Sequence, residues 1–374
     1  METFKSTVMS GGYMITCILT ILSFVYCLML YPKLIQFFKN KNLLEIPDER
    51  KLHKQPTPSS GGLLFTIPCL LVLPFLVLDV AMMITIFMGM GLIVLGYVDD
   101  RKDLSPKIKF SGQFLVAILA VQILGPLKII PELLTVDVFW INYLITVLLI
   151  VGFTNAFNLL DGSDGLSGSY ALVMLIGIAI LAIMQNNIIL FLMTMTMAGA
   201  IAAFLIFNFN PAQIFMGDSG SLFLGYILSI SLIYHVNYIE EMGVALSDGL
   251  LILAGMMLAV LDTLRVMFSR IARKRSPFSA DRTHLHHLLQ KLGLKPKSIV
   301  YCVIAFLFVI IAYAFVMIKL VQMNPVQTLF GMASFGMLLM WGVFLLRVRL
   351  LRVKLNKHKQ HIQKIEKQNY LLSK

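Results

Sequence analysis

The sequence contains eleven apolar stretches that are long enough, or nearly so, to form membrane-crossing helices. About 20 helical residues cross the hydrocarbon core of a bilayer, and a spanning helix satisfies all of its own backbone hydrogen bonds. The mean hydropathy of +0.85 is far above that of a soluble globular protein. We therefore predict an all-α polytopic integral membrane protein with about 11 transmembrane helices. The predicted spans cover residues 12–37, 61–78, 80–98, 111–128, 136–153, 169–184, 187–206, 220–236, 249–268, 299–320 and 325–347.

The basic residues predict how these spans are oriented. The net charge is +12, which would suggest nucleic-acid binding in a soluble protein. If the eleven spans alternate, however, only Lys5, Lys128 and Lys319 of the 31 Lys and Arg residues fall on one side. The positive-inside rule makes the other side cytoplasmic, with the N-terminus outside and the C-terminus inside. We expect one membrane-embedded catalytic domain over residues 1–347, a basic cytoplasmic tail over residues 348–374, and no nucleic-acid partner.

The few carboxylates gather at the predicted cytoplasmic ends of the spans. The chain is only 13% charged, yet Asp99, Asp100 and Asp103 stand together after the third span. Such a cluster suits metal binding or proton abstraction. A solvated helix end followed by stop-transfer basic residues is the simpler alternative for this motif.

The second polar motif is NAFNLLDGSDGLSGS, after the fifth span. If the helix continues, Asn155, Asn158 and Asp161 share one face. Asn and Asp oxygens suit Mg²⁺ and the hydroxyls of a sugar or nucleoside, and the glycines allow a ligand to approach the backbone. Asp164 belongs to the same motif, for which a helix-capping turn is the alternative.

The third motif, NFNPAQIFMGDSGS, places Asn210 before a proline and Asp218 at the start of the eighth span. Backbone amides at a helix N-terminus favour phosphate, and Asp218 could bind a metal or serve only as a helix cap.

Two basic loops add candidate phosphate contacts. RKRSPFSADRTHLHH carries Arg282, His284, His286 and His287, whose spacing and lack of cysteines fit zinc poorly. PDERKLHKQPTPSSGG carries Lys54 and a small-residue segment, although a basic loop before a membrane span is common. Together, hard oxygen ligands, a polyanion site and a membrane setting suggest phosphoryl transfer between a nucleotide and a lipid.

The Asp pair, NAFNLLDGSDGL, NPAQIFMGDSGS and HLHH occur in the same order in polyprenyl-phosphate N-acetylhexosamine-1-phosphate transferases, and the chain resembles this family over roughly residues 47–290. HLHH and eleven spans are similar to the bacterial undecaprenyl-phosphate N-acetylglucosamine-1-phosphate transferase branch. The muramoyl-pentapeptide branch has three consecutive histidines and ten spans. The resemblance implies transfer of N-acetylglucosamine 1-phosphate from UDP-GlcNAc to undecaprenyl phosphate. That reaction starts lipid-linked synthesis of a cell-envelope glycan, such as lipopolysaccharide or teichoic acid, at the cytoplasmic face of the bacterial inner membrane.

The resemblance also implies a role for each motif. Asp99 and Asp100 would act on the lipid phosphate, or on metal and phosphate, while Asp161 and Asp164 would line the nucleotide-sugar pocket. These four are the catalytic candidates. Asp218 and Asn158 would bind Mg²⁺, with Mn²⁺ as a substitute. The expected substrate-binding residues are Lys54, Asn155, Asn210, Arg282, His284, His286 and His287.

Three alternatives stay open at this point. The same chemistry could use another UDP-N-acetylhexosamine, such as UDP-N-acetylgalactosamine or a deoxy-amino sugar, because no motif reads one hydroxyl epimer. A transporter would place its acids near the bilayer midplane rather than at one end of the spans. A scaffolding protein would not need three clusters of Asp and Asn. A homodimer is also left open.

Overall fold

A computed structural model of the chain describes residues 2–45, 56–77, 79–127, 139–241, 247–277 and 283–372. These residues form a helical bundle with one two-stranded antiparallel pair, β1 (Leu44–Glu45) and β2 (Thr57–Pro58). The long helices are α1 (Glu2–Asn40), α3 (Val80–Lys102), α4 (Pro106–Leu124), α6 (Phe139–Leu160), α7 (Leu166–Met184), α8 (Ile188–Asn208), α9 (Gly217–Glu241), α10 (Ser247–Ala272), α12 (Pro296–Phe315) and α13 (Pro325–Leu372). A π-helical turn, η3 (Val316–Leu320), continues α12, and α11 (Leu285–Lys291) is short.

Ten helices in the described part of the chain are long and apolar enough to cross a membrane. Each overlaps a span predicted from the sequence, so the prediction of a polytopic all-α membrane protein is confirmed. Two of them extend further toward the polar motifs than predicted, since α3 ends at Lys102 and α6 at Leu160. Asp99 and Asn158 therefore belong to helices α3 and α6. Their polar side chains are paired with other protein groups.

The predicted span 61–78 is a broken helix rather than one continuous rod. Its apolar helical part runs only from Gly61 to Phe75, which makes it shorter than the other spans. Pro68 and Pro74 lie inside it, and each lacks the backbone N–H that a regular helix uses. The segment consists of η1 (Gly61–Phe65), α2 (Thr66–Val72) and η2 (Leu73–Phe75).

This broken helix nevertheless connects the two ends of the bundle. Before it, the Ser60 hydroxyl donates to Asp100 near the end of α3 at 2.6 Å. After it, Asp79 accepts from Tyr234, late in α9, at 2.5 Å. Because Asp100 also contacts the first residues of α9, the chain passes from one end of α9 toward the other between residues 60 and 79. The segment therefore runs along the bundle, although it is shorter than the ten helices that are long enough to cross a membrane.

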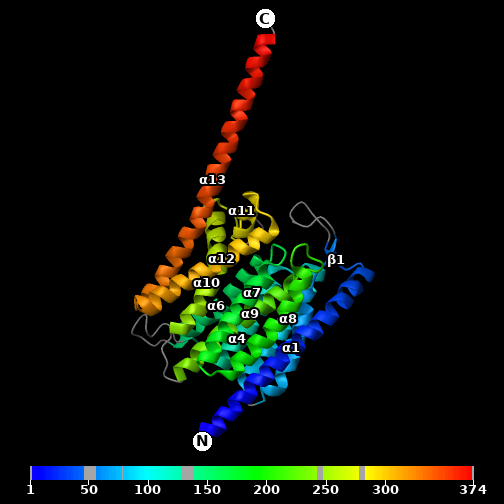
Figure 1. Cartoon of the computed structure of the whole chain (residues 1–374), viewed down its shortest axis with the longest axis vertical. Coiled ribbons are helices and arrows are strands. Elements are labelled where there is room, and N and C mark those ends of the chain that lie inside the picture. Colours follow the sequence, from blue (N-terminus) through cyan, green and yellow to red (C-terminus); the bar gives the residue numbers. More distant parts are fainter. Residues whose placement is uncertain are drawn as a thin grey trace.

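The helix ends alternate between what we call the site end, where Asp100 meets the start of α9, and the opposite end. At the site end, Asn158 of α6 donates to Asp218 of α9 at 2.9 Å. At the opposite end, Asn237 of α9 donates to the Leu124 carbonyl of α4 at 2.7 Å. Figure 1 shows β1 and α11 at the site end and the N-terminus at the opposite end.

α9 is the central helix of the bundle, and 83% of the residues in its most apolar 18-residue segment are buried. Small residues let its neighbours approach closely, as is common between membrane helices. A Cβ added at Gly225 would lie 2.7 Å from the Thr154 Cα and 3.1 Å from the Phe157 side chain of α6. A Cβ added at Gly89 of α3 would lie 2.8 Å from the Tyr226 ring of α9. This packing fixes where α3 and α6 present their polar ends relative to α9.

α13 runs without interruption past residue 347 to Leu372. The boundary expected between the membrane domain and the tail therefore falls inside one helix. Figure 1 shows the last part of α13, in red, extending away from the bundle on the side of the site end.

Candidate active site

A pocket of about 530 Å³ lies at the site end, where α3, α4 and α9 meet β1 and the loops after β2 and α6. Acidic side chains dominate its lining, while Arg101 and Lys109 are cationic residues that also line it. Six of the residues predicted from the sequence line this pocket: Asp99, Asp100, Asp161, Asp164, Asp218 and His287.

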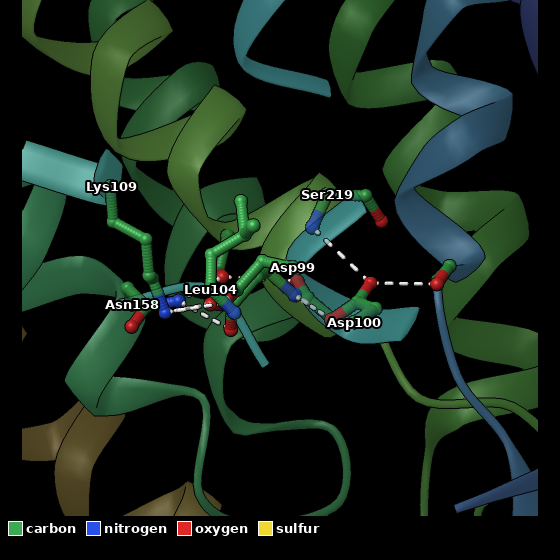
Figure 2. A network of polar contacts seen from close by, with 10 residues as sticks. Asp99, Asp100, Leu104, Lys109, Asn158 and Ser219 are labelled. Carbon is green, nitrogen blue, oxygen red and sulfur yellow. Dashed lines mark hydrogen bonds and ion pairs between the residues drawn. The ribbon is translucent and has the colours of Figure 1, made fainter. Parts of the chain in front are cut away.

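Asp100 fixes the beginning of α9. Its carboxylate accepts from the backbone N–H of Asp218 at 2.8 Å and from that of Ser219 at 3.5 Å. It also accepts from the Ser60 hydroxyl at 2.6 Å. A carboxylate at a helix N-terminus satisfies amides that have no partner within the helix and complements the helix dipole. The amides that the sequence suggests for phosphate binding are thus engaged by Asp100 (Figure 2).

Lys109 of α4 bridges the carboxylates of Asp99 and Asp218. Its ammonium lies 2.5 Å from Asp99 and makes a second, very close ion pair with Asp218. The other oxygen of Asp99 accepts from the Leu104 amide at 2.7 Å. Figure 2 shows the Lys109 side chain reaching down to this cluster from its helix. A positive charge between two carboxylates relieves their repulsion and marks a position that favours a cation.

Asn158 holds Asp218 from the other side. Its amide nitrogen donates to Asp218 at 2.9 Å and lies 2.8 Å from the Ser221 hydroxyl. Both oxygens of Asp218 therefore have a partner, while the side chain stays 25% exposed to the pocket. Asn158 contributes to the site by orienting Asp218, although it is not among the lining residues.

Asp164 ties the loop after α6 to the loop after α8. It accepts from the Asn210 side chain at 2.9 Å and from the Ala212 amide at 3.2 Å. Asn208 reinforces the connection, since it accepts from the Gly165 amide at 3.0 Å and donates to the Ile214 carbonyl at 2.9 Å. Asn210 is thus brought to the site as a partner of Asp164.

Asp161 lies in the loop after α6, and its surroundings there shift its pKa strongly. Burial raises its pKa to about 7, and the charges of Asp218, Glu45 and Asp100 act in the same direction. A hydrogen bond of 2.5 Å from the Ser167 hydroxyl opposes the shift. Asp161 therefore changes protonation near neutral pH, within a pocket crowded with other acids.

Asp262 of α10 organises the histidine motif. It accepts from the His284 Nδ1 at 3.0 Å and from the Leu285 amide at 3.0 Å. Arg265 donates to the same carboxylate at 2.7 Å and to the Thr283 carbonyl at 2.5 Å. His284 is buried by these contacts, so it serves to anchor the start of α11 rather than to face the pocket.

His286 and His287 differ in their surroundings. His286 is buried against Gly162, and neither ring nitrogen has a hydrogen-bond partner in the described part of the chain. Burial and the neighbouring histidines lower its pKa to about 3, so the ring stays neutral. The His287 ring lies 4.2 Å from that of His286 and lines the pocket. Of the three predicted histidines, His287 is the one that faces the pocket.

The structure does not place the three remaining substrate-binding candidates among the described residues that line the pocket. Asn155 is half-buried on α6, one turn before Asn158, and is not among the lining residues. Lys54 and Arg282 lie outside the described residues. In the small-residue segment after Lys54, Ser59 lines the pocket, whereas the Gly61 and Gly62 amides pack by donating to the Phe215 and Met216 carbonyls.

Two residues that hold the site together were not among the predicted site residues. Lys109 follows the Asp99–Asp103 cluster closely in the sequence, but its pairing with Asp218, 109 positions later, needs the folded chain. Asp262 carried a signal that could have found it, since it is an acid inside the predicted span 249–268. Ionisable residues within membrane spans are expensive and commonly functional.

The carboxylates of Asp99 and Asp218, on either side of the Lys109 ammonium, are suited to hold a magnesium ion. No group of three or more His, Cys, Asp or Glu in the described residues is arranged to hold a metal by itself. Mg²⁺ commonly uses one or two carboxylates together with substrate phosphates and water. Asp99 and Asp218, which already share the Lys109 ammonium, are a carboxylate pair of that kind.

The chain is similar in sequence to known proteins. The sequence model of glycosyl transferase family 4 matches residues 82–236, which include the Asp pair and the motifs around Asp161 and Asp218. A probable undecaprenyl-phosphate N-acetylglucosaminyl 1-phosphate transferase of Bacillus subtilis is 36% identical over 276 residues, or 71% of this chain and 75% of the relative.

Two further relatives are also similar. A decaprenyl-phosphate N-acetylglucosaminephosphotransferase of Mycolicibacterium smegmatis is 32% identical over 281 residues, covering 66% of this chain and 68% of the relative. A phospho-N-acetylmuramoyl-pentapeptide-transferase of Halalkalibacterium halodurans is 30% identical over 297 residues, covering 72% and 87%.

Proposed function

This chain belongs to glycosyl transferase family 4 and to its polyprenyl-phosphate sugar-phosphate transferases, and we propose that it transfers N-acetylglucosamine 1-phosphate from UDP-GlcNAc to undecaprenyl phosphate. The products are UMP and undecaprenyl-diphospho-N-acetylglucosamine. The relatives named for N-acetylglucosamine transfer support the sugar, and the HLHH motif supports that branch over the muramoyl-pentapeptide one.

The observation that carries this proposal is the Asp99–Lys109–Asp218 cluster in an acid-lined pocket at one end of the membrane helices. Such a site can meet a water-soluble nucleotide from outside the bilayer and a lipid phosphate from its surface. A transporter would need its charged residues along a path through the bundle. The clustering of the predicted motifs at the site end therefore favours an enzyme.

The reaction moves one phosphoryl group. An oxygen of the lipid phosphate forms a bond to the sugar-bearing phosphorus of UDP-GlcNAc. The bond from that phosphorus to the bridging oxygen breaks, and UMP leaves with the electron pair. Mg²⁺ held by Asp218, with Asp99 and Asn158 beside it, would offset the negative charge on the diphosphate. Lys109 supplies a further positive charge beside the same carboxylates.

We place the attack directly on the donor, without a covalent enzyme intermediate. A carboxylate nucleophile must be free and in line with the phosphorus. Asp100 is engaged by two amides and a hydroxyl, and Asp99 by Lys109 and Leu104, which argues against either. Enzyme incubated with UDP-GlcNAc labelled in the sugar phosphate, without lipid, should acquire no covalent label. A stable labelled enzyme would overturn direct attack.

The site end is proposed to face the cytoplasm of a bacterial inner membrane. Two observations support this orientation: the basic residues concentrate on the loops of the site end, and UDP-sugars are cytoplasmic. A green fluorescent protein fused after Lys374 should fluoresce in intact cells. A periplasmic reporter active at that position would reverse the orientation.

The enzymatic test uses the purified full chain in detergent with undecaprenyl phosphate and MgCl₂. UMP release and lipid-linked product should appear with UDP-GlcNAc. UDP-N-acetylgalactosamine and UDP-N-acetylmuramoyl-pentapeptide are the competing donors. Asp218→Ala should abolish both signals, while Lys102→Gln, an exposed charge outside the pocket lining, should keep them. Product with another donor alone would reassign the sugar, and activity retained in Asp218→Ala would reject the assignment of the site.

A further inference from the structure

Arg101 is a cation of the pocket that the site as described leaves unused. It lines the pocket, directly after the Asp pair at the end of α3. Its Nε and Nη2 are buried, and neither has a hydrogen-bond partner in the described part of the chain. Guanidinium N–H groups that are buried without a partner are costly, because they have lost water and gained no acceptor in return.

Two aromatic rings hold this guanidinium in place. The Arg101 Cζ lies 4.8 Å from the centre of the Phe38 ring of α1 and 5.3 Å from that of Tyr97 on α3. Phe38 is itself buried, so the ring offers a fixed surface. Cation–π contacts of this kind offset part of the cost of burial and limit the orientations of the guanidinium plane. These ring contacts leave Nε and Nη2 without a hydrogen-bond partner in the described part of the chain.

The unpartnered edge has the geometry of an anion-binding fork. Nε and Nη2 present parallel N–H groups, which match two oxygens of a phosphate. Lys109, the lysine among the pocket-lining residues, is less suited to this contact because it is already shared between Asp99 and Asp218. The carboxylates around the pocket would repel an anionic substrate unless positive charge were provided near it.

We propose that Arg101 binds phosphate oxygens of a substrate through Nε and Nη2. The inference rests on the proposed function, which brings two sources of that chemistry into the pocket. One is the diphosphate of the nucleotide sugar, and the other is the phosphate of the polyprenyl acceptor. Both would reach an arginine that lies beside the reacting cluster.

The test measures binding and turnover separately. Arg101→Gln removes the charge, Arg101→Lys keeps the charge but loses the fork, and Lys102→Gln removes a neighbouring exposed charge as the matched control. Affinity for UDP-GlcNAc and for undecaprenyl phosphate is measured on each full-length variant by calorimetry in detergent, alongside KM, kcat and the thermal midpoint.

We expect Arg101→Gln to weaken the binding of one substrate about 10- to 100-fold, with a matching rise in its KM and a smaller change in kcat. Arg101→Lys should recover part of that loss, and Lys102→Gln should behave as wild type. The substrate affected identifies the source of the phosphate. Wild-type affinity of Arg101→Gln for both substrates would overturn the inference, as would a lower thermal midpoint with unchanged affinities.

Failure of the proposed function looks different. A wild-type protein that binds the substrates but releases no UMP would reject the reaction, while the comparison of Arg101 variants would still test phosphate binding. A wild-type protein that binds neither substrate would reject both.

Discussion

Substituting Asp100 should damage the site by loosening the start of α9 rather than by removing a reacting group. In Asp100→Ala, the Asp218 and Ser219 amides and the Ser60 hydroxyl lose their acceptor. Loss of a helix N-cap costs about 0.5–2 kcal/mol, and a hydrogen bond to a charged group contributes about 1.5–3 kcal/mol. These terms overlap, so we expect about 2–4 kcal/mol for Asp100→Ala. Asp100→Asn, which keeps one acceptor oxygen, should lose roughly half of that.

The assay pairs thermal unfolding in detergent with steady-state kinetics. Asp100→Asn and Ser60→Ala should both lower the thermal midpoint by a few degrees, because both weaken the contacts that cap α9. The variant with the larger loss of thermal midpoint should also show the larger loss of kcat. Ser105→Ala is the matched control, since Ser105 precedes α4 without a side-chain capping bond. If Asp100→Asn is inactive but unfolds like wild type, and Ser60→Ala is fully active, Asp100 acts in the chemistry and the capping argument is wrong.

Three other variants test separate contacts of the site. Lys109→Gln leaves two carboxylates without their shared cation, so kcat should fall at least tenfold and the Mg²⁺ needed for half-maximal rate should change; an unchanged magnesium titration would contradict the shared position. The pKa of His286 is about 3 in the folded chain, below its ordinary value of 6.5, so the unfolded chain binds a proton that the folded chain does not, and stability is lost as pH falls from 6.5 toward 3. His286→Phe cannot titrate, and its thermal midpoint should therefore fall less than that of wild type between pH 7 and pH 5; parallel curves would refute this. Asp262→Asn should weaken the anchoring of α11 and raise the KM for UDP-GlcNAc severalfold with less effect on the acceptor, as measured by initial rates; equal effects on both substrates would contradict a local role.

The membrane architecture could be predicted because it depends on local composition. Ten apolar runs became helices, and the broken one carries two prolines within the run. The grouping of the acids at one end also followed, since alternation of spans places successive loops on alternating sides.

The contacts within the site could not be predicted in the same way. Asp100 and Asp218 are 118 positions apart in the chain, and Lys109 and Asp218 are 109 positions apart. Which carboxylate caps a helix and which faces the pocket depends on how α3, α4 and α9 pack. The sequence treats Asp99 and Asp100 as an equivalent pair, whereas the fold gives one to Lys109 and the other to the amides of α9.

In the proposed reaction, the sugar moves to the lipid together with its own phosphate. UDP-GlcNAc labelled with ³²P at either the α- or the β-phosphate separates this reaction from transfer of the sugar alone. With undecaprenyl phosphate and Mg²⁺, the β-label should appear in the lipid fraction and the α-label in UMP. Both labels remaining together in released UDP, with unlabelled sugar on the lipid, would contradict the account.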